Sequence, residues 1–190
     1  ELERERLIAQ IQSWLKVEKY RESSFTVSAT EKKFSGSIFG IDVNLSLDRV
    51  DDLKDGSRLV LDYKTGTPVL SDLFSDRPEE PQLLLYQVAL DQQESDAKKI
   101  GIGYGVINSS KTNLVAVLPQ GEDVSVIGGR KPSDCSKWDL LVPRWKRTIE
   151  VLADEFNVGY AAITPSKNAC RYCDLKAVCR IQQSRPEVET

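Results

Sequence analysis

The stretch Leu59-Val60-Leu61-Asp62-Tyr63-Lys64-Thr65-Gly66 joins an apolar run directly to a carboxylate and a lysine. A short apolar run bounded by turn residues is typical of a buried strand. Side chains two positions apart on a strand share a face, so Asp62 and Lys64 point the same way. The sequence therefore predicts a strand over 58–63 that delivers Asp62 and Lys64 together at its end.

A second strand precedes this one and carries another carboxylate. Residues 41–50 alternate between an apolar side, with Val43, Leu45 and Leu47, and a polar side, with Asn44, Ser46 and Asp48. A turn at Asp55-Gly56-Ser57 separates the two strands. An antiparallel pairing around this turn can place Asp48 and Asp62 on one face.

Two adjacent carboxylates with a lysine have a chemical use. Carboxylate oxygens bind hard divalent cations such as Mg²⁺, and such an ion polarises a phosphodiester and activates water. Lys64 can orient that water or offset charge in the transition state, and the backbone carbonyl of Tyr63 is a further candidate ligand. The alternative is an exposed strand on which Asp and Lys simply pair, but it leaves the apolar run before Asp62 and the matching Asp48 unexplained. We therefore favour metal chemistry.

The composition limits the other possibilities. The 190 residues suit one globular domain with a core of its own, and the net charge of −3 means that any contact with nucleic acid is local. The chain contains no His, which excludes imidazole bases and ligands. No stretch is long and apolar enough to cross a membrane, and we expect a cytoplasmic protein. The chain starts at Glu1 without an initiator methionine, and we interpret it as part of a larger protein.

The remaining pattern indicates an α/β fold with a mixed central sheet flanked by helices. A helical stripe over 2–17 holds Leu2, Leu7, Ile8, Ile11, Trp14 and Leu15. We expect strands at 25–30, 34–39, 41–50, 58–63, 99–107 and 113–118, a loop over 121–136, and a helix over 136–158. A further helix is expected from an N-cap at Asp76, with Pro78 in its first turn, to about Gln92.

Three cysteines near the C-terminus form a second candidate site. Cys170, Cys173 and Cys179 have the C-x2-C spacing that suggests metal before disulfide in a cytosolic chain. An iron–sulfur cluster and a Zn²⁺ ion both suit thiolates, and either needs a fourth ligand. The alternative is three free or buried thiols. Cys135 stands apart.

Basic residues gather before and within the helix over 136–158, and they are Lys131, Lys137, Arg144, Lys146 and Arg147. They could contact phosphates, but a solvated helix face is the interpretation that we prefer.

Four motifs together resemble the RecB-family branch of the PD-(D/E)XK nucleases. They are Asp48-Arg49-Val50-Asp51, Leu61-Asp62-Tyr63-Lys64-Thr65-Gly66, a Q-x-x-x-Y motif at Gln82 to Tyr86, and the cysteine cluster, which is similar to that of AddB-like members. They occur in the family's order between about residues 31 and 180. The resemblance implies a restriction-endonuclease-like core.

The resemblance also assigns roles to single residues. It implies that Asp48 and Asp62 bind Mg²⁺ or Mn²⁺, that Lys64 is the catalytic lysine, and that Gln82 and Tyr86 lie near the metal and the DNA backbone. Gln82 and Tyr86 are four residues apart and share a helical face, although a helix surface with a half-buried Tyr would give the same pattern. Glu31 corresponds to an accessory acidic position, or is an exposed residue beside Lys32 and Lys33.

Two members of the family's ligand sets are missing from this chain. RecB-like nucleases usually carry a metal-binding His upstream, and the AddB-like 4Fe–4S cluster takes a fourth Cys from far upstream, where Cys135 does not lie.

We expect a single nuclease domain over residues 1–182, with a Cys-containing segment at 165–182 and a polar, frayed tail at 183–190. The expected activity is metal-dependent DNA cleavage, by an exonuclease of DNA repair and recombination, with DNA and a helicase-like domain or subunit as partners. The alternatives are a catalytically inactive nucleic-acid-binding module on the same fold and a Zn-stapled interaction domain.

Overall fold

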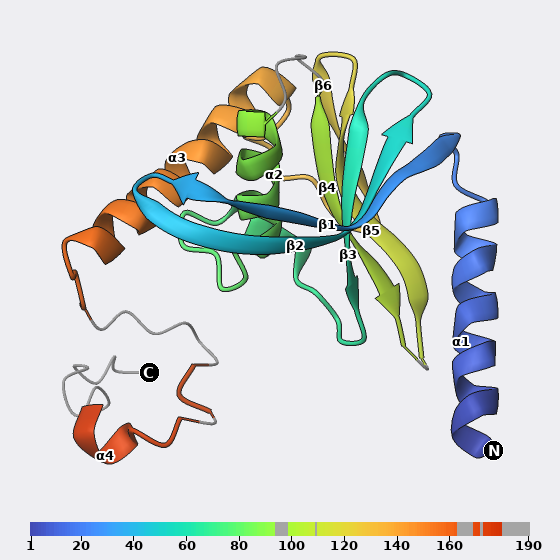
Figure 1. The fold of residues 1–190 in the computed structure, drawn as a ribbon, viewed down its shortest axis with the longest axis horizontal. Coiled ribbons are helices and arrows are strands. Elements are labelled where there is room, and N and C mark those ends of the chain that lie inside the picture. Colours follow the sequence, from blue (N-terminus) through green and yellow to red (C-terminus); the bar gives the residue numbers. More distant parts are fainter. Residues whose placement is uncertain (94–98, 109, 163–168, 172, 180–190) are drawn as a thin grey trace.

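The computed structural model describes residues 1–93, 99–108, 110–162, 169–171 and 173–179 (Figure 1). Its elements are α1 (Leu2–Lys19), β1 (Phe25–Ile38), β2 (Ile41–Leu53), β3 (Arg58–Lys64), the 3₁₀ helix η1 (Leu70–Phe74), α2 (Gln82–Gln93), β4 (Ile100–Ile107), β5 (Thr112–Gln120), β6 (Asp123–Ile127), α3 (Trp138–Asn157) and α4 (Lys176–Cys179).

The described strands form one six-stranded sheet in the order β1-β2-β3-β4-β5-β6. Strands β3 and β4 are parallel, and every other neighbouring pair is antiparallel. Helix α2 makes the crossover between β3 and β4. The expectation of a mixed central sheet flanked by helices is therefore confirmed.

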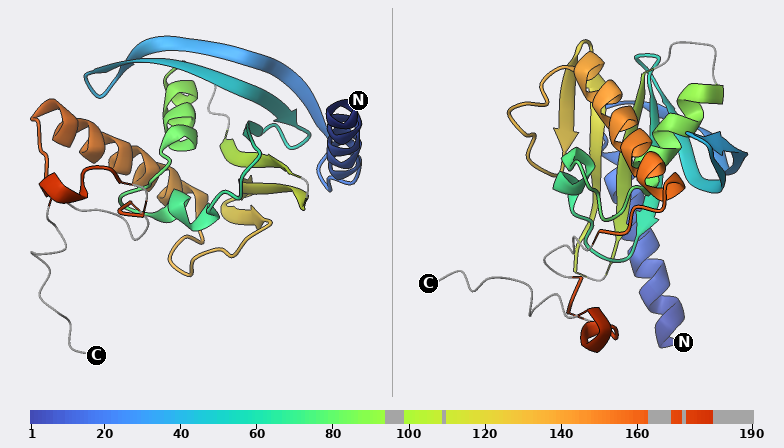
Figure 2. Two further views of the ribbon diagram at one scale, coloured as in Figure 1. Left: turned by 90° about the horizontal axis from the view of Figure 1, so that it is seen from below. Right: turned by 90° about the vertical axis from the view of Figure 1, so that its left-hand side faces the viewer.

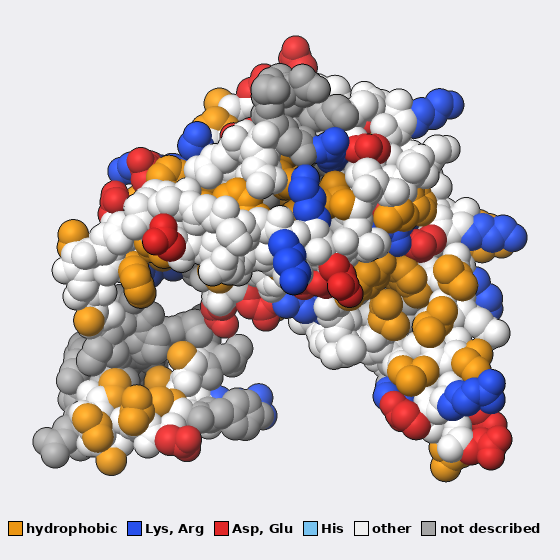
Figure 3. Space-filling view, in the orientation of Figure 1, with side chains coloured by type: hydrophobic (Ala, Val, Ile, Leu, Met, Phe, Trp, Pro, Cys, Tyr) orange, Lys and Arg blue, Asp and Glu red, His pale blue; other side chains and the backbone are white. Residues whose placement is uncertain are grey.

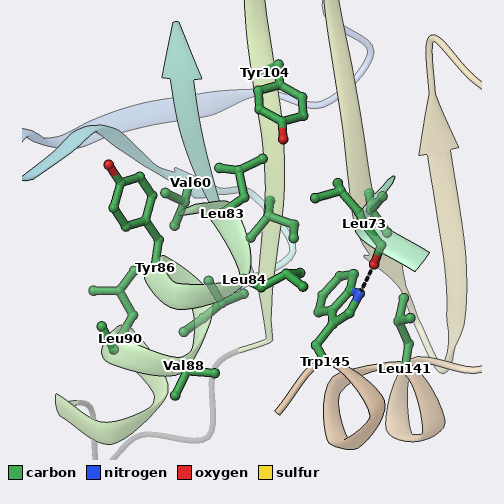
Figure 4. Close-up of a cluster of buried hydrophobic side chains, with 14 of the residues drawn as sticks. Val60, Leu73, Leu83, Leu84, Tyr86, Val88, Leu90, Tyr104, Leu141 and Trp145 are labelled. Carbon is green, nitrogen blue, oxygen red and sulfur yellow. Dashed lines mark hydrogen bonds between the residues drawn. The ribbon is translucent and has the colours of Figure 1, made fainter. Parts of the chain in front are cut away.

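Helices cover both faces of the sheet (Figures 1 and 2). Helices α2 and α3 lie over one face and close the larger core, which includes Val60, Leu83 and Leu84. Helix α1 lies on the other face, where a smaller core gathers around Trp14, Leu59 and Leu61. Within the larger core the indole of Trp145 donates a hydrogen bond of 2.7 Å to the carbonyl of Leu73, which ties α3 to η1 (Figure 4).

The first two strands form a long hairpin that curves over α2 (Figure 2). Its two-residue turn is Phe39-Gly40, both with positive φ (48° and 80°), as a type I′ turn requires. Strand β1 is continuous where the sequence indicated two strands, at 25–30 and 34–39. The irregularity is instead a shift of register between Val27 and Ala29, which keeps the pairing while bending the strand.

Helix α2 begins at Gln82, so the expected N-cap at Asp76 is wrong. The carboxylate of Asp72 accepts hydrogen bonds of 2.9 Å from the backbone N–H groups of Glu79 and Glu80. These bonds hold the segment before α2 as a loop against η1. The first helical turn closes from the carbonyl of Pro81 to the N–H of Leu85, at 3.0 Å.

Two further expectations are corrected. Residues 121–136 are not all loop, because Asp123–Ile127 forms the edge strand β6 on β5. The apolar stripe of α1 is mostly outside the core: of its residues only Trp14 is buried, and Leu2, Leu7, Ile8, Ile11 and Leu15 are exposed. Hydrophobic side chains accordingly show along α1 at the right of Figure 3. The helix expected over 136–158 is confirmed as α3, whereas the tail at 183–190 lies outside the described residues.

Replacing Gly105 with Ala is expected to loosen α1. A Cβ at this position would lie 2.6 Å from the Tyr63 ring and 3.0 Å from Trp14, and these two rings pack edge to face at 5.5 Å. Overpacking of this kind costs about 1–3 kcal/mol, which urea denaturation can measure. Gly66→Ala is the matched control, because nothing lies within 4 Å of its Cβ. Equal stabilities of the two variants would contradict the prediction.

Candidate active site

The pairing of β2 with β3 brings Asp48 and Asp62 together. Arg49 pairs with Leu61 in the antiparallel register, so Asp48 and Asp62 are the next two residues to face each other. At this position the N–H of Tyr63 donates a hydrogen bond of 2.9 Å to Asp48 Oδ2, and not to a backbone carbonyl of β2. The two carboxylates thus stand side by side where the strands separate.

Asp62 is almost fully buried, with 4% of its surface exposed. Burial raises the pKa of its carboxyl, the charges of Asp48 and Glu80 add to this, and Lys64 opposes it. Lys64 Nζ lies 3.1 Å from Asp62 Oδ2, and this ion pair is the polar contact of that buried oxygen. Two adjacent carboxylates balanced by one ammonium can also bind a divalent cation.

Lys64 stands at the centre of the polar contacts around Asp62. Its ammonium lies 3.1 Å from Asp62, 3.5 Å from Glu80 Oε2 and 3.4 Å from the side-chain oxygen of Gln82. Burial lowers the pKa of Lys64, but the contacts with Asp62 and Glu80 outweigh this and raise it overall. Lys64 is therefore a cation in this arrangement.

Gln82 and Tyr86 connect Lys64 to the hairpin. Gln82 accepts from Lys64 through Oε1 and donates through Nε2 to the hydroxyl of Tyr86. Tyr86 in turn donates a hydrogen bond of 2.7 Å to the carbonyl of Ser46 on β2. Burial and the charges of Asp62 and Asp48 raise the pKa of Tyr86, so its hydroxyl remains a donor. The structure brings both residues of the Q-x-x-x-Y motif to the carboxylates.

A buried ion cluster backs the site from the opposite face of the sheet. Arg49 follows Asp48 on β2 and points to the α1 side, where its guanidinium contacts Asp51 at 2.6 Å, Glu18 of α1 and the Tyr63 hydroxyl at 3.0 Å. Arg21 contacts the other oxygen of Asp51, also at 2.6 Å. The side chain of Asp51 is completely buried. The cluster joins α1 to the two strands that carry the carboxylates.

Two other candidate ligands, Glu31 and the carbonyl of Tyr63, make none of the side-chain contacts described above. Glu31 lies between the registered pairs Thr30↔Arg49 and Lys32↔Leu47, hence across from Asp48, but it is exposed and its φ is 49°. A positive φ is strained for such a residue. Metal binding by Glu31, and by the carbonyl of Tyr63, stays a prediction.

Sequence reasoning missed Glu80 and Asp72. Glu80 lies beside Lys64, and Asp72 holds the backbone of Glu79 and Glu80 in place. No motif contains either residue. Pro78 and Pro81 lie between η1 and α2, and they were the sign in the sequence that this segment beside Lys64 is a loop and not a helix.

The cysteines are not assembled into a site in the part of the chain that the structure describes. Cys170, Cys173 and Cys179 are free and partly exposed, and the described residues contain no group of three or more His, Cys, Asp or Glu side chains placed to hold a metal. A thiolate cluster at these cysteines stays a prediction, and Cys135 is buried beside Asp134 and Arg144.

The basic residues of α3 and the loop before it make intramolecular contacts, as a solvated helix face would. Arg144 contacts Asp134, Arg147 contacts Glu150 and Lys137 contacts Asp123. Lys131 donates to the carbonyl of Val124.

A mixed sheet that presents one carboxylate on β2, and a second carboxylate with a lysine at the end of the neighbouring β3, is typical of a restriction-endonuclease-like fold. The comparison with family models agrees, since residues 1–180 match the model of the PD-(D/E)XK nuclease superfamily. The chain belongs to this superfamily.

Solved structures show weaker similarity. A protein of Eubacterium rectale named "Putative exonuclease" is 15% identical, with a TM-score of 0.42 over 98% of this chain. The chain spans 61% of the length of that protein. A second structure, SSO0001, is 13% identical, with a TM-score of 0.33 over 92% of this chain and 68% of its own. Curated proteins gave no match. Within the described residues, no helix has the length and apolar character needed to cross a bilayer.

Proposed function

We propose that this domain is a metal-dependent deoxyribonuclease, acting as an exonuclease. The observation that carries the proposal is the pair Asp48 and Asp62, side by side on β2 and β3, with the ammonium of Lys64 at 3.1 Å from Asp62. Mg²⁺ commonly takes one or two carboxylates and fills its other positions with water and substrate phosphate. Asp48 and Asp62 supply two such carboxylates.

Asp48 and Asp62 would hold Mg²⁺ or Mn²⁺, with Tyr63 contributing its carbonyl. The bound ion would polarise the phosphodiester and activate water. The ammonium of Lys64 lies beside Asp62 and is placed to offset negative charge that develops on the phosphate. Gln82 and Tyr86 orient Lys64 and fix α2 to the base of the hairpin.

The resemblance to RecB- and AddB-like proteins supports a narrower assignment. We propose a cytoplasmic role in DNA repair and recombination, with residues 1–182 as one nuclease domain that acts together with a helicase-like domain or subunit. Cys170, Cys173 and Cys179 would bind an iron–sulfur cluster together with a fourth ligand from elsewhere, and we derive no step of the reaction from them.

Lys64→Ala is expected to lower the rate of DNA cleavage by roughly 10²–10³-fold, the usual cost of losing one group that stabilises transition-state charge. The test incubates linear single- and double-stranded DNA with the protein and Mg²⁺, Mn²⁺ or EDTA. Lys54→Ala is the matched control, because Lys54 is exposed in the β2–β3 turn, and it should cut as the wild type does. Cleavage that persists in EDTA, or in Lys64→Ala at the wild-type rate, would contradict the proposal.

A further inference from the structure

The turn between β4 and β5 lies near the end of the strand that carries Lys64. Strands β3 and β4 are parallel, and Lys64 pairs with Val106. Ile107 pairs with Thr112 across the turn, so the turn continues past the level of Lys64.

A polar hollow separates this turn from the middle of α1, which lies beside it in both Figure 1 and Figure 2. The hollow has a volume of about 430 Å³, and we call it the α1–turn pocket; it is lined by Arg6, Ala9, Gln10, Ser13, Lys16, Asn108, Ser110, Lys111 and Thr112. Three of these residues are cations and none is a carboxylate, although the whole chain carries a net charge of −3. The lining is therefore complementary to an anion.

The lysines of the pocket are available for an external anion. Neither Lys16 nor Lys111 forms an ion pair within the described residues, whereas the basic residues of α3 mostly do. Arg6 pairs with Glu3, but both side chains are more than half exposed, at 52% and 67%. An exposed pair of this kind is weak and screened by salt, so Arg6 can also contact a phosphate.

Both walls of the pocket are held in place. The side chain of Asn108 accepts hydrogen bonds from the backbone N–H groups of Ser110 and Lys111, at 3.0 and 2.6 Å, and fixes the turn. Helix α1 is anchored by Trp14 against Tyr63 and by Glu18 against Arg49. Donors on one face of α1 thus oppose donors on a fixed turn.

We propose that the α1–turn pocket binds backbone phosphates of the DNA strand that is being cut. This inference rests on the proposed nuclease function and adds a substrate-binding site to it. The pocket lies on the α1 face of the sheet, whereas Asp62 and Lys64 face α2, so a strand that contacts both passes around the end of β3 and β4. Its contribution is affinity and alignment of the strand, not chemistry.

The test is binding of fluorescently labelled linear DNA in EDTA, which prevents cutting, measured by anisotropy over a series of salt concentrations. The variant is Lys16→Gln combined with Lys111→Gln. Each lost phosphate contact reduces the slope of log affinity against log salt by about 0.9, so the double variant should lose a slope of about 2 and bind at least tenfold more weakly at low salt. Lys146→Gln with Arg147→Gln on α3 is the control with the same change of charge, and thermal melts verify folding.

The α3 control should retain the wild-type slope. Equal slopes for wild type and the pocket variant, an equal loss in the control, or no DNA binding by the wild type would each overturn the inference. The nuclease proposal fails separately, through the Lys64 experiment. Cutting that needs Lys64 while the pocket variant binds normally would reject the pocket alone. Pocket-dependent binding without cutting would reject the nuclease alone.

Discussion

Replacing Asp62 with Asn is expected to abolish metal-dependent cleavage while making the folded domain more stable. Loss of an outer-shell partner typically costs a metal site ~10–100-fold in affinity, and removal of a proposed direct ligand should exceed that. Titration calorimetry with Mn²⁺ measures the affinity, and the DNA cleavage assay measures the rate. Metal binding and cleavage should both fall below detection.

The gain in stability follows from the buried charge. Burial raises the pKa of Asp62 above its usual 3.8, so the folded state favours the protonated form, and the charged form costs stability as pH rises through the raised pKa. Asn resembles the protonated acid at every pH. Its advantage, on the order of 1 kcal/mol as for other stabilising substitutions, should therefore appear at neutral pH and vanish below about pH 3.8, where Asp62 is protonated in both states.

Asp91→Asn is the matched control, because Asp91 is exposed on α2, and it should change neither property. A variant of Asp62 that binds Mn²⁺ as tightly as the wild type would remove Asp62 from the metal site. If Asp62→Asn is less stable than the wild type at neutral pH without added metal, the buried charge of Asp62 does not destabilise the fold, and this part of the prediction is wrong.

Asp51→Ala is expected to destabilise the domain by about 3–5 kcal/mol, the usual cost of breaking a buried ion pair by removing one partner. The carboxylate of Asp51 is shared between Arg21 and Arg49, whose side chains are only 6% and 7% exposed. Both guanidinium groups would lose their common anion, and Glu18 would be left to balance Arg49. Urea denaturation followed by circular dichroism gives the free energy of unfolding.

The neighbouring Asp52 provides the control for that prediction. It pairs with Arg58 at 2.7 Å, but its side chain is 41% exposed, so Asp52→Ala should cost only about 0.2–1 kcal/mol. Similar losses from the two substitutions would contradict the buried cluster as a main source of stability.

The placement of Asp48 against Asp62 was predictable because local rules determine it. The turn at Asp55-Gly56 sets the register, and the two-residue period of a strand sets the faces. The same period places Lys64 with Asp62. Contacts between distant segments follow no such local rule. The carboxylate of Asp72 holds the backbone of Glu79 and Glu80 in the loop before α2. The capping preference of Asp76 alone could not reveal this contact.

Exposure of apolar residues was equally hard to foresee. A helical stripe in the sequence of α1 shows which side chains share a face, but not how much of that face the sheet covers. Among the residues of this stripe only Trp14 is buried, and the neighbouring Val17 packs against the same core. Strand β6 was missed because Gly121, Gly128 and Gly129 flank it and suggest a loop, although its own residues 123–127, with two Val and one Ile, favour a strand that pairs with β5.

The adjacency of Asp48 and Arg49 on β2 has a consequence for errors in strand assembly. A slip of β2 by one residue against β3 would exchange the two side chains between the faces of the sheet. A guanidinium would then enter the cation site, and a carboxylate would be set against Phe25, whose ring now lies 3.8 Å from Arg21. Each change would leave a buried charge without an opposite partner, and each would therefore raise the free energy of the misaligned sheet. The same register of β2 against β3 therefore sets both the ion cluster on the α1 side and the pairing of Asp48 with Asp62 on the α2 side.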